Sequence, residues 1–244
     1  MQNIIDELSR CGFYSDEDGK IFLVEKPLHW SSFDVCKKIR ALLHEKKVGH
    51  GGTLDPYAEG LLIVFTAKKT KLAEKFSAME KEYTGEMILG ATTQSFDLEK
   101  EIQWRCSVEN ISGAKIEETF SSFLGTQQQI PPMFSAAKVD GKRLYRYARE
   151  GISIERKPRT IVISQFEASE IDIPLVKFKI VCSKGTYIRT LIDDAGFRLG
   201  CGAYLKSLKR TRVGSLHFGN ALTIEQISQR FSRVNFLMPF NLAA

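Results

Sequence analysis

Segments patterned like strands and segments patterned like helices follow one another irregularly along this chain, and that order constrains its fold more than any other feature. Residues 60–66 (GLLIVFT) form a short, continuous apolar run, which is typical of a buried strand. Residues 176–182 have a period of two, with lysines at positions 177 and 179, which is typical of a half-buried strand. Because strands and helices do not alternate as regular strand–helix–strand units, the sequence predicts an α+β fold.

Local patterns predict several further elements. Residues 20–26 and 83–89 are expected to be strands. A helix should begin after Ser31, which has Asp34 three residues on, as in a capping box, and the helix should bury an apolar face that includes Val35 and Ile39. Three more helices are predicted: residues 69–79, a helix after Arg189 that ends near Gly200, and residues 223–231.

The length and composition are those of an ordinary globular protein. The chain has 244 residues, 43% hydrophobic and 26% charged, and is long enough to bury a core without disulfides or a structural metal. No repeat or linker divides it, so we expect one domain over residues 1–244 with an insertion at about 125–152. The longest apolar stretch, near residues 61–65, is too short for a membrane span, and residues 1–7 lack a secretory signal. A cytoplasmic protein without membrane partners is expected.

Neither metal nor cofactor binding is predicted from the motifs. The five cysteines include no CxxC pair, and the four histidines include no HExxH pair. A phosphate-binding GxxxxGK[ST] motif is absent from the glycine-rich loop at residues 49–56, and Leu54 stands where a GxGxxG fingerprint needs its third glycine.

The distribution of charge points to a nucleic-acid partner. Lys and Arg total 35 against 29 acids, which gives a net charge of +6 and a pI near 9.0. One segment concentrates this excess, with Asp140 as its single acid and Tyr145 and Tyr147 interleaved; its cations are Lys138, Lys142, Arg143, Arg146 and Arg149. Mixed cations and tyrosines supply phosphate contacts and stacking surfaces for RNA. Lys37 and Lys38, by contrast, are consistent with a solvated helix face.

Two residues outside that segment are candidates for chemistry. Asp55 follows three glycines and precedes Pro56, so it either forms a simple turn or presents a carboxylate to a ligand. Arg189 is either the cationic partner that a buried carboxylate needs or a surface arginine lying over the core. Spacing does not show whether the two meet. The adjacent Asp193 and Asp194 are interpreted as structural, because neighbouring helix residues do not face each other and acids are favoured early in a helix.

Several motifs carry a family resemblance. Residues 49–56 (GHGGTLDP) resemble the catalytic loop of the TruB family of tRNA pseudouridine synthases. Other matches run in order along the chain: Lys26-Pro27 with Ser31-Ser32, Lys81-Glu82-Tyr83, Pro131-Pro132 through Ser135-Ala136 with Gly141, Tyr145, Ala148 and Arg149, residues 183–191 (SKGTYIRTL), and Leu208-Lys209-Arg210. Together they cover about residues 20–214.

The resemblance implies a fold and an activity. The fold would be the pseudouridine synthase fold, with a mixed, mostly antiparallel central sheet flanked by helices and loops and an inserted RNA-binding thumb at about residues 125–152. The activity would be isomerisation of uridine to pseudouridine in the T-loop of tRNA, at conventional position 55, without a cofactor. The partner would be the T-arm stem-loop of tRNA, bound by a monomer that flips the target base out of its stack.

The resemblance also assigns residue roles. Asp55 would be the essential carboxylate, Arg189 its ion-pair partner, and Tyr83 the ring that stacks on the detached uracil. Residues that would contact the flipped base or its loop are His50, Tyr187 and Leu208. Residues that would contact RNA are Lys26, Arg210, Arg143, Arg146 and Arg149, and the thumb that carries the last three is expected to be mobile until RNA binds.

Two departures from the family pattern qualify these expectations. The family's first motif usually has glycine where this chain has His29, which puts the local turn in doubt. Only 30 residues follow Gly214, so we expect no separate PUA-type RNA-binding domain and fewer contacts to the acceptor side of tRNA.

Two other functions fit the same features. A tRNA-folding chaperone would need the RNA grip and the base flip without the chemistry. A base-excising glycosylase would also use a carboxylate and a flipped base, but it would release free uracil.

Overall fold

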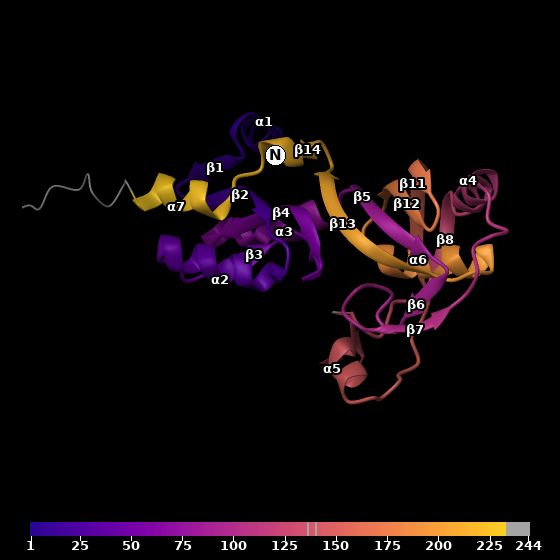
Figure 1. Cartoon of the computed structure of the whole chain (residues 1–244). Coiled ribbons are helices and arrows are strands. Elements are labelled where there is room, and N and C mark those ends of the chain that lie inside the picture. Colours follow the sequence, from indigo (N-terminus) through magenta and orange to yellow (C-terminus); the bar gives the residue numbers. More distant parts are fainter. Residues whose placement is uncertain (136, 140, 233–244) are drawn as a thin grey trace, which may run out of the picture. The chain divides into compact units, whose positions relative to one another are not determined.

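The structure is a computed structural model that describes residues 1–135, 137–139 and 141–232 and divides into two compact units (Figure 1). The first unit comprises Met1–Met79 with Lys209–Ala244, and the second comprises Glu80–Leu208. Ala136 and Asp140, both in the expected thumb, lie outside the described residues. Among the described residues, no helix is long and apolar enough to cross a bilayer.

The first unit combines short helices with strands that are close in sequence. Its strands are β1 (Phe13–Asp16), β2 (Gly19–Lys26), β3 (Val48–His50), β4 (Ala58–Thr66), β14 (Leu216–His217) and the end of β13 (Ala203–Val213). Its helices are α1 (Gln2–Cys11), α2 (Ser32–Leu43), the 3-10 helix η1 (Ala67–Leu72), α3 (Ala73–Ser77), the 3-10 helix η2 (Phe218–Asn220) and α7 (Ile224–Ser232). β1 pairs with β2, and β2 and β3 with β4, all antiparallel, so the strands predicted at residues 20–26 and 60–66 are confirmed.

Both faces of the β2–β4 pair are buried, which explains the continuous apolar run in β4. Ile21 of β2 and Ile63 of β4 pack on one face with α1 and α3, whereas Phe22 and Val64 pack on the other with α2 and α7. A strand covered on two faces needs apolar residues at every position rather than at alternate ones. The period-two alternation is therefore masked in β4, as the sequence predicted.

The turn and helix after β2 form as expected, with one unusual backbone. Ser31 accepts a hydrogen bond from the Asp34 backbone N–H, and the Asp34 carboxylate accepts from the Ser31 backbone N–H, which confirms the capping box. His29 has a φ of +65°, a left-handed conformation that glycine adopts most easily. The turn therefore keeps the shape that a glycine would favour, and its His29 ring meets the Tyr57 ring edge-on at 5.5 Å.

The helix predicted at residues 69–79 is shorter and less regular than expected. The chain forms η1 and then α3, and Thr70 Oγ1 donates to the Ala67 carbonyl within the 3-10 turn. Phe76 is nevertheless fully buried in the first unit's core, with Leu72 and Met79 packed against the same cluster. The apolar spacing thus identified the buried face correctly but not the tighter winding.

The second unit is built on one antiparallel sheet. The strands of this unit are β5 (Lys81–Leu89), β6 (Ala91–Thr93), β7 (Ile102–Arg105), β8 (Gly125–Gln129), β9 (Lys138–Val139), β10 (Lys142–Arg143), β11 (Arg159–Asp172), β12 (Leu175–Cys182) and the start of β13. β6 and β7 pair with each other in a separate two-stranded sheet. β5 pairs with β12, β12 with β11 and β11 with β8, all antiparallel. The strands predicted at residues 83–89 and 176–182 are confirmed, as is the α+β class with mostly antiparallel strands.

Helices cover one side of this sheet. α4 (Gly113–Ser121) packs on β11, where the Phe120 and Phe166 rings stack 3.8 Å apart. α6 (Ile188–Leu199) ends at Gly200 in a left-handed cap, as the sequence predicted, and packs against α4. Arg198 of α6 lies over the Phe123 ring at 3.7 Å. These aromatic contacts hold α6, whose first turn carries Arg189.

The expected thumb divides into two parts. Residues 125–129 form β8, a strand of the second unit's sheet, so the range of 125–152 begins too early. After the Pro131-Pro132 pair, β9 and β10 form a separate two-stranded sheet that leads into α5 (Leu144–Arg149). A sheet strand rich in glutamine does not look apolar, which explains why the sequence did not separate β8 from the basic segment.

The two adjacent acids in α6 do not lie early in the helix, as the sequence analysis expected. Asp193 and Asp194 lie in the middle of the helix rather than in its first turn, so the helix dipole does not explain them. Burial, followed by the charge of Asp194, raises the pKa of Asp193 to about 6.

Candidate functional site

The loop that carries Asp55 is fixed by main-chain hydrogen bonds within the first unit. The Gly51 N–H donates to the Ile63 carbonyl at 2.9 Å, which ties the start of the loop to β4. The Ser32 hydroxyl accepts from the Leu54 N–H at 2.8 Å and donates to the Leu54 carbonyl at 3.0 Å. The Ala58 N–H then donates to the Asp55 carbonyl at 3.0 Å. The backbone on both sides of the Asp55 carboxylate is therefore held in place, with Leu54 buried.

Arg210 of β13 braces the same loop from inside the unit. Its side chain is 1% exposed, and its guanidinium donates to the main-chain carbonyls of Leu61, Thr53 and Gly52 at 2.8, 3.4 and 3.1 Å. A planar cation with several fixed donors suits this task, because it joins β4 to two successive loop residues. This bracing role was not expected from the sequence, and the expected contact of Arg210 with RNA stays a prediction.

Lys26, at the end of β2, is a second buried cation. It has no exposed surface, and its ammonium donates to the carbonyls of Pro27, at 2.9 Å, and Trp30. Burial lowers the pKa of Lys26 to about 8, although the nearby Asp55 and Glu59 carboxylates act in the opposite direction. The Lys26 ammonium therefore holds the turn that precedes α2, and its expected contact with RNA likewise stays a prediction.

Arg189, in the first turn of α6, is buried in the second unit rather than spread over the surface. It is 5% exposed, and its guanidinium donates to the Ser95 carbonyl at 3.0 Å and to the Phe134 carbonyl at 2.6 Å. Its Nε lies 3.5 Å from Oδ2 of Asp97, which is 3% exposed. The interpretation of Arg189 as a surface arginine is therefore wrong.

Asp97 is a site residue that the sequence analysis missed. Its Oδ1 accepts from the Ser95 hydroxyl at 2.6 Å and from the Glu99 N–H at 2.9 Å, which fixes the carboxylate that faces Arg189. Asp97 stands in a polar stretch with Glu99, Lys100 and Glu101, where an acid is expected on the surface. The one available signal was Arg189 itself, since a buried arginine requires a buried partner.

Gln129, at the end of β8, positions the residues before Arg189. Its amide Nε2 donates to the Tyr187 carbonyl at 3.0 Å, and its Oε1 accepts from the Tyr187 N–H at 2.8 Å. Gln129 is 4% exposed, and this two-way bond imitates one step of a sheet ladder. It fixes Tyr187, the residue that precedes α6, and so sets where the helix starts.

The remaining site residues take defined places in their own units. Tyr83 lies in β5 opposite Ile180 and is buried, as is Leu208 in β13. His50 ends β3 and Tyr187 precedes α6, and both are half-buried. The first unit thus brings together Lys26, Asp55 and Arg210, and the second brings together Arg189, Asp97, Gln129 and Tyr187.

The basic segment presents its arginines to solvent. Arg143, Arg146 and Arg149 are exposed, and Arg149 lies 5.4 Å from the centre of the Tyr145 ring. Hydrogen bonding from Arg146 lowers the pKa of Tyr145. Lys142 lies over the Tyr147 ring at 4.4 Å and pairs with Glu150 at 2.6 Å. The cations and rings of α5 are therefore ordered against one another on an accessible helix.

Among residues 1–135, 137–139 and 141–232, no group of three His, Cys, Asp or Glu side chains could hold a metal ion. The chemistry available from the described site is that of a fixed carboxylate, buried guanidinium groups and aromatic rings.

The chain is similar to known proteins over most of its length. Residues 40–188 match the model of the TruB family pseudouridylate synthase N-terminal domain, and residues 189–235 match that of the tRNA pseudouridylate synthase B C-terminal domain. A tRNA pseudouridine synthase B from Parabacteroides distasonis is 48% identical over 215 residues, which are 86% of this chain and 92% of that protein. Its namesake from Phocaeicola vulgatus is 46% identical over 219 residues, 87% of this chain and 93% of that protein.

Solved structures agree on the fold. The chain resembles a protein in a Cbf5-Nop10-Gar1 complex with a TM-score of 0.70 and 27% identity, over 91% of this chain and 57% of that one. A second likeness, to a chain in an H/ACA RNP bound to a substrate RNA, has a TM-score of 0.66 and 25% identity, over 91% of this chain and 56% of that one. The chain thus spans just over half the length of these two structural relatives. From the two matched domain models and the curated relatives, the chain belongs to the TruB family of pseudouridylate synthases.

Proposed function

We propose that the chain isomerises uridine to pseudouridine in the T-loop of tRNA, at conventional position 55. The observation that carries the proposal is its 48% identity, over 86% of its length, to a protein named tRNA pseudouridine synthase B. The fixed backbone of the loop around Asp55 supports it, because isomerisation at a sugar carbon needs a precisely placed carboxylate.

The reaction balances without an oxidant or a cofactor. The C1′–N1 bond of the target uridine breaks, the uracil turns, and its C5 bonds to C1′. The proton on C5 leaves, and N1 gains a proton. Asp55 is the essential carboxylate whether it attacks C1′, as in retaining glycosidases, attacks the base, or removes a proton from the sugar.

Each unit supplies groups for this reaction. In the proposal Arg189 pairs with Asp55 and keeps it ionised, while Asp97 holds the Arg189 guanidinium in a fixed orientation. Tyr83 stacks on the detached uracil, and Leu208 and Tyr187 line its surroundings. The two-way bond from Gln129 to Tyr187 supports this assignment, since it fixes the start of the helix that carries Arg189.

Exposed side chains are proposed to bind the RNA. Arg143, Arg146 and Arg149 are proposed to contact phosphates of the T arm, and the neighbouring tyrosines offer stacking surfaces. The target base is stacked inside the T-loop, so it has to be flipped out, and His50 is proposed to stabilise that state. The protein would act as a monomer in the cytoplasm, where tRNA is processed.

Tritium release tests the proposal. The substrate is a T-arm stem-loop transcript labelled as [5-³H]uridine, and the wild type is compared with Asp55→Ala. We expect the wild type to release tritium to water without free uracil and Asp55→Ala to release none, because the C5 proton leaves only when C5 bonds to C1′.

Other outcomes identify the rival functions. Free uracil would identify a base-excising glycosylase. An absence of release from both the stem-loop and full-length tRNA, together with faster tRNA folding by wild type and Asp55→Ala alike, would identify a folding chaperone.

A further inference from the structure

A hollow of about 440 Å³ opens beside α2 in the first unit, and none of the residues that were given a catalytic or RNA-binding role above lines it. His29, Trp30, Asp34, Lys37, Lys38 and Ala41 line it. Its volume lies within the range of about 300–1,000 Å³ that is usual for ligand pockets. It is large enough to hold a single nucleotide.

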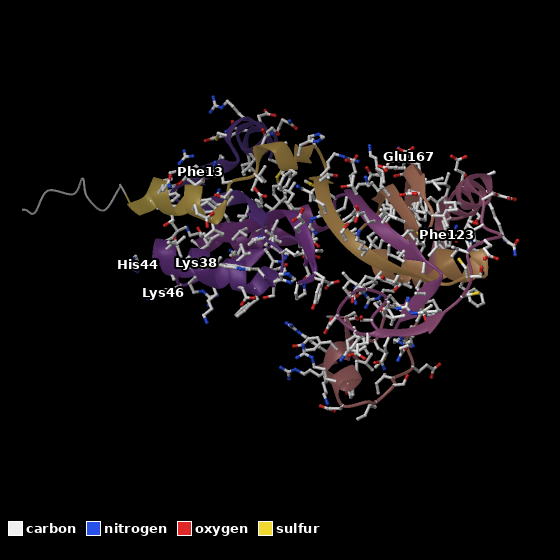
Figure 2. All side chains as sticks on the ribbon, in the orientation of Figure 1. Phe13, Lys38, His44, Lys46, Phe123 and Glu167 are labelled. Atoms are coloured by element: carbon white, nitrogen blue, oxygen red, sulfur yellow. The ribbon has the colours of Figure 1, made fainter. Side chains whose placement is uncertain are left out.

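The spacing of the lining residues shows how α2 forms this hollow. Positions 34, 37, 38 and 41 are separated by three, four and seven residues, so they share one face of the helix. Val35, Cys36 and Ile39 point to the core from the opposite face. Ala41 is the smallest lining side chain and leaves space where a longer residue would fill it. Figure 2 labels Lys38 on α2, and His44 and Lys46 where the helix ends.

Hydrogen bonds connect the rim of the hollow to the loop that carries Asp55. The buried Lys26 ammonium holds the Trp30 carbonyl, and the His29 N–H donates to the Pro56 carbonyl at 2.8 Å. The His29 ring meets the Tyr57 ring edge-on, two residues after Asp55. A ligand in this hollow would therefore lie next to the catalytic loop of the same unit.

The charge and ring chemistry of the hollow match a nucleotide. Lys37 and Lys38 are exposed, so their ammonium groups are available to an anion. The one lining acid, Asp34, turns its Oδ2 toward the helix cap, where it accepts from the Ser31 N–H at 2.9 Å and from the Ser31 hydroxyl at 2.6 Å. The indole of Trp30 supplies the kind of flat surface on which nucleobases stack, and the two lysines supply the phosphate partners.

We propose that this hollow binds one unpaired nucleotide of the tRNA T arm, next to the target uridine, with its base on Trp30 and its phosphate between Lys37 and Lys38. The inference rests on the proposed function and adds a docking point for the RNA strand that leads to Asp55. It also gives Lys37 and Lys38 a role beyond that of a solvated helix face.

Tryptophan fluorescence tests the stacking directly. The chain has two tryptophans, so Trp104→Phe leaves Trp30 as the only reporter. Asp55→Ala in the same protein prevents turnover during a titration with the T-arm stem-loop transcript. We expect saturable quenching, and we expect its loss when Lys37→Ala and Lys38→Ala are added. Absence of quenching, or quenching by full-length tRNA alone, would overturn the proposal.

Salt dependence tests the phosphate contact. Each phosphate contact to a single strand contributes about 0.7 to the slope of log affinity against log salt, so Lys37→Ala/Lys38→Ala should reduce that slope by about 1.4. Lys46→Ala/Lys47→Ala is the matched control, because it removes the same charge from two exposed residues of the same unit that do not line the hollow. Equal reductions in the two pairs would indicate diffuse attraction and contradict a defined site.

Kinetic measurements in the tritium assay distinguish a failure of the docking site from a failure of the proposed function. In the tritium assay, Lys37→Ala/Lys38→Ala should raise KM about tenfold and leave kcat unchanged, which corresponds to about 1.4 kcal/mol of lost binding. Ala41→Trp, which fills the hollow without a change of charge, should raise KM in the same way. Wild-type release with unchanged KM in both variants would remove the docking site and leave the isomerase intact, whereas no wild-type release would remove the function itself.

Discussion

The two units of this protein hold their buried cations in different ways. In the first unit, Arg210 and Lys26 donate to main-chain carbonyls, and the result is a fixed loop and a fixed turn around Asp55. In the second unit, Arg189 donates to two carbonyls and also faces the buried carboxylate of Asp97. Carbonyl acceptors satisfy a cation's hydrogen bonds without balancing its charge, whereas a carboxylate does both.

The buried cations of the first unit therefore hold the backbone in place, whereas the buried pair of the second unit fixes the charge and orientation of a guanidinium. The first unit shapes the backbone that presents a carboxylate, and burial lowers the pKa of one of its braces, Lys26, to about 8. The second unit keeps a guanidinium charged and oriented beside the start of α6. The comparison predicts that removing a carboxylate harms the second unit most, and that removing a donor harms the first.

The largest effect is expected from Asp97→Asn. The substitution keeps the side-chain size but removes the buried negative charge that faces Arg189, and breaking such a buried pair costs about 3–5 kcal/mol. Urea unfolding should show that loss, and the tritium assay should show reduced kcat. Glu170→Gln provides the control, because the Glu170–Lys177 pair is exposed and is expected to contribute less than about 1 kcal/mol. Similar losses in both variants would erase the distinction between a buried and a surface pair.

Arg210→Met should give the next largest effect. Methionine fills part of the volume but removes the donor to three carbonyls: that of Leu61, whose bond is buried, and those of Thr53 and Gly52, whose bonds are partly buried. An unsatisfied buried acceptor costs about 1–3 kcal/mol, and the two partly buried bonds add less. We expect a total loss of about 3 kcal/mol in urea unfolding. Lys209→Met, at the adjacent strand position with a partly exposed ammonium, should lose less than about 1 kcal/mol. An unchanged Arg210→Met midpoint would show that the loop does not depend on this brace.

Gln129→Leu tests positioning inside the second unit without touching a charge. It removes both hydrogen bonds to the Tyr187 backbone from a buried site, for an expected loss of about 2 kcal/mol. Because the start of α6 is then free to shift, kcat should fall while KM for the T-arm transcript changes little. Gln128→Leu is the neighbouring control, since the Gln128 side chain is exposed and its amide donates to the exposed Thr160 hydroxyl. A rise in KM with constant kcat would contradict a positioning role.

The sequence predicted best those elements whose residue pattern has one physical cause. β4 is apolar throughout because two faces are covered, and the Ser31–Asp34 capping box is a local exchange of hydrogen bonds that needs no tertiary contact. The Asp55 loop could be identified as a candidate for the same reason, since its glycines and proline act locally.

The features that the sequence could not reveal depend on contacts far along the chain. Asp97 and Arg189 are 92 positions apart, so nothing in the local pattern distinguishes Asp97 from a surface acid. The resemblance assigned Lys26 and Arg210 to RNA contacts, and only the fold shows that both are buried and donate to main-chain carbonyls. β8 was hidden for a similar reason, since its polar side chains pair through the backbone with β11.

The smallest effect is a pH dependence that belongs to Lys26 alone. Its pKa is about 8 in the folded protein and about 10.5 in the unfolded chain, so between these values the unfolded state binds more protons. The contribution of Lys26 to the free energy of unfolding must therefore rise with pH through this window, by about 1 kcal/mol between pH 8 and pH 9. Lys26→Met should lack that increment, and subtracting its urea-derived stabilities from those of the wild type cancels the groups common to both proteins. Lys20→Met, which removes a half-buried lysine paired with Glu45, should keep the full increment. Parallel pH profiles for wild type and Lys26→Met would mean that a carboxylate balances the Lys26 charge as Asp97 balances Arg189, and the two units would then hold their cations in the same way.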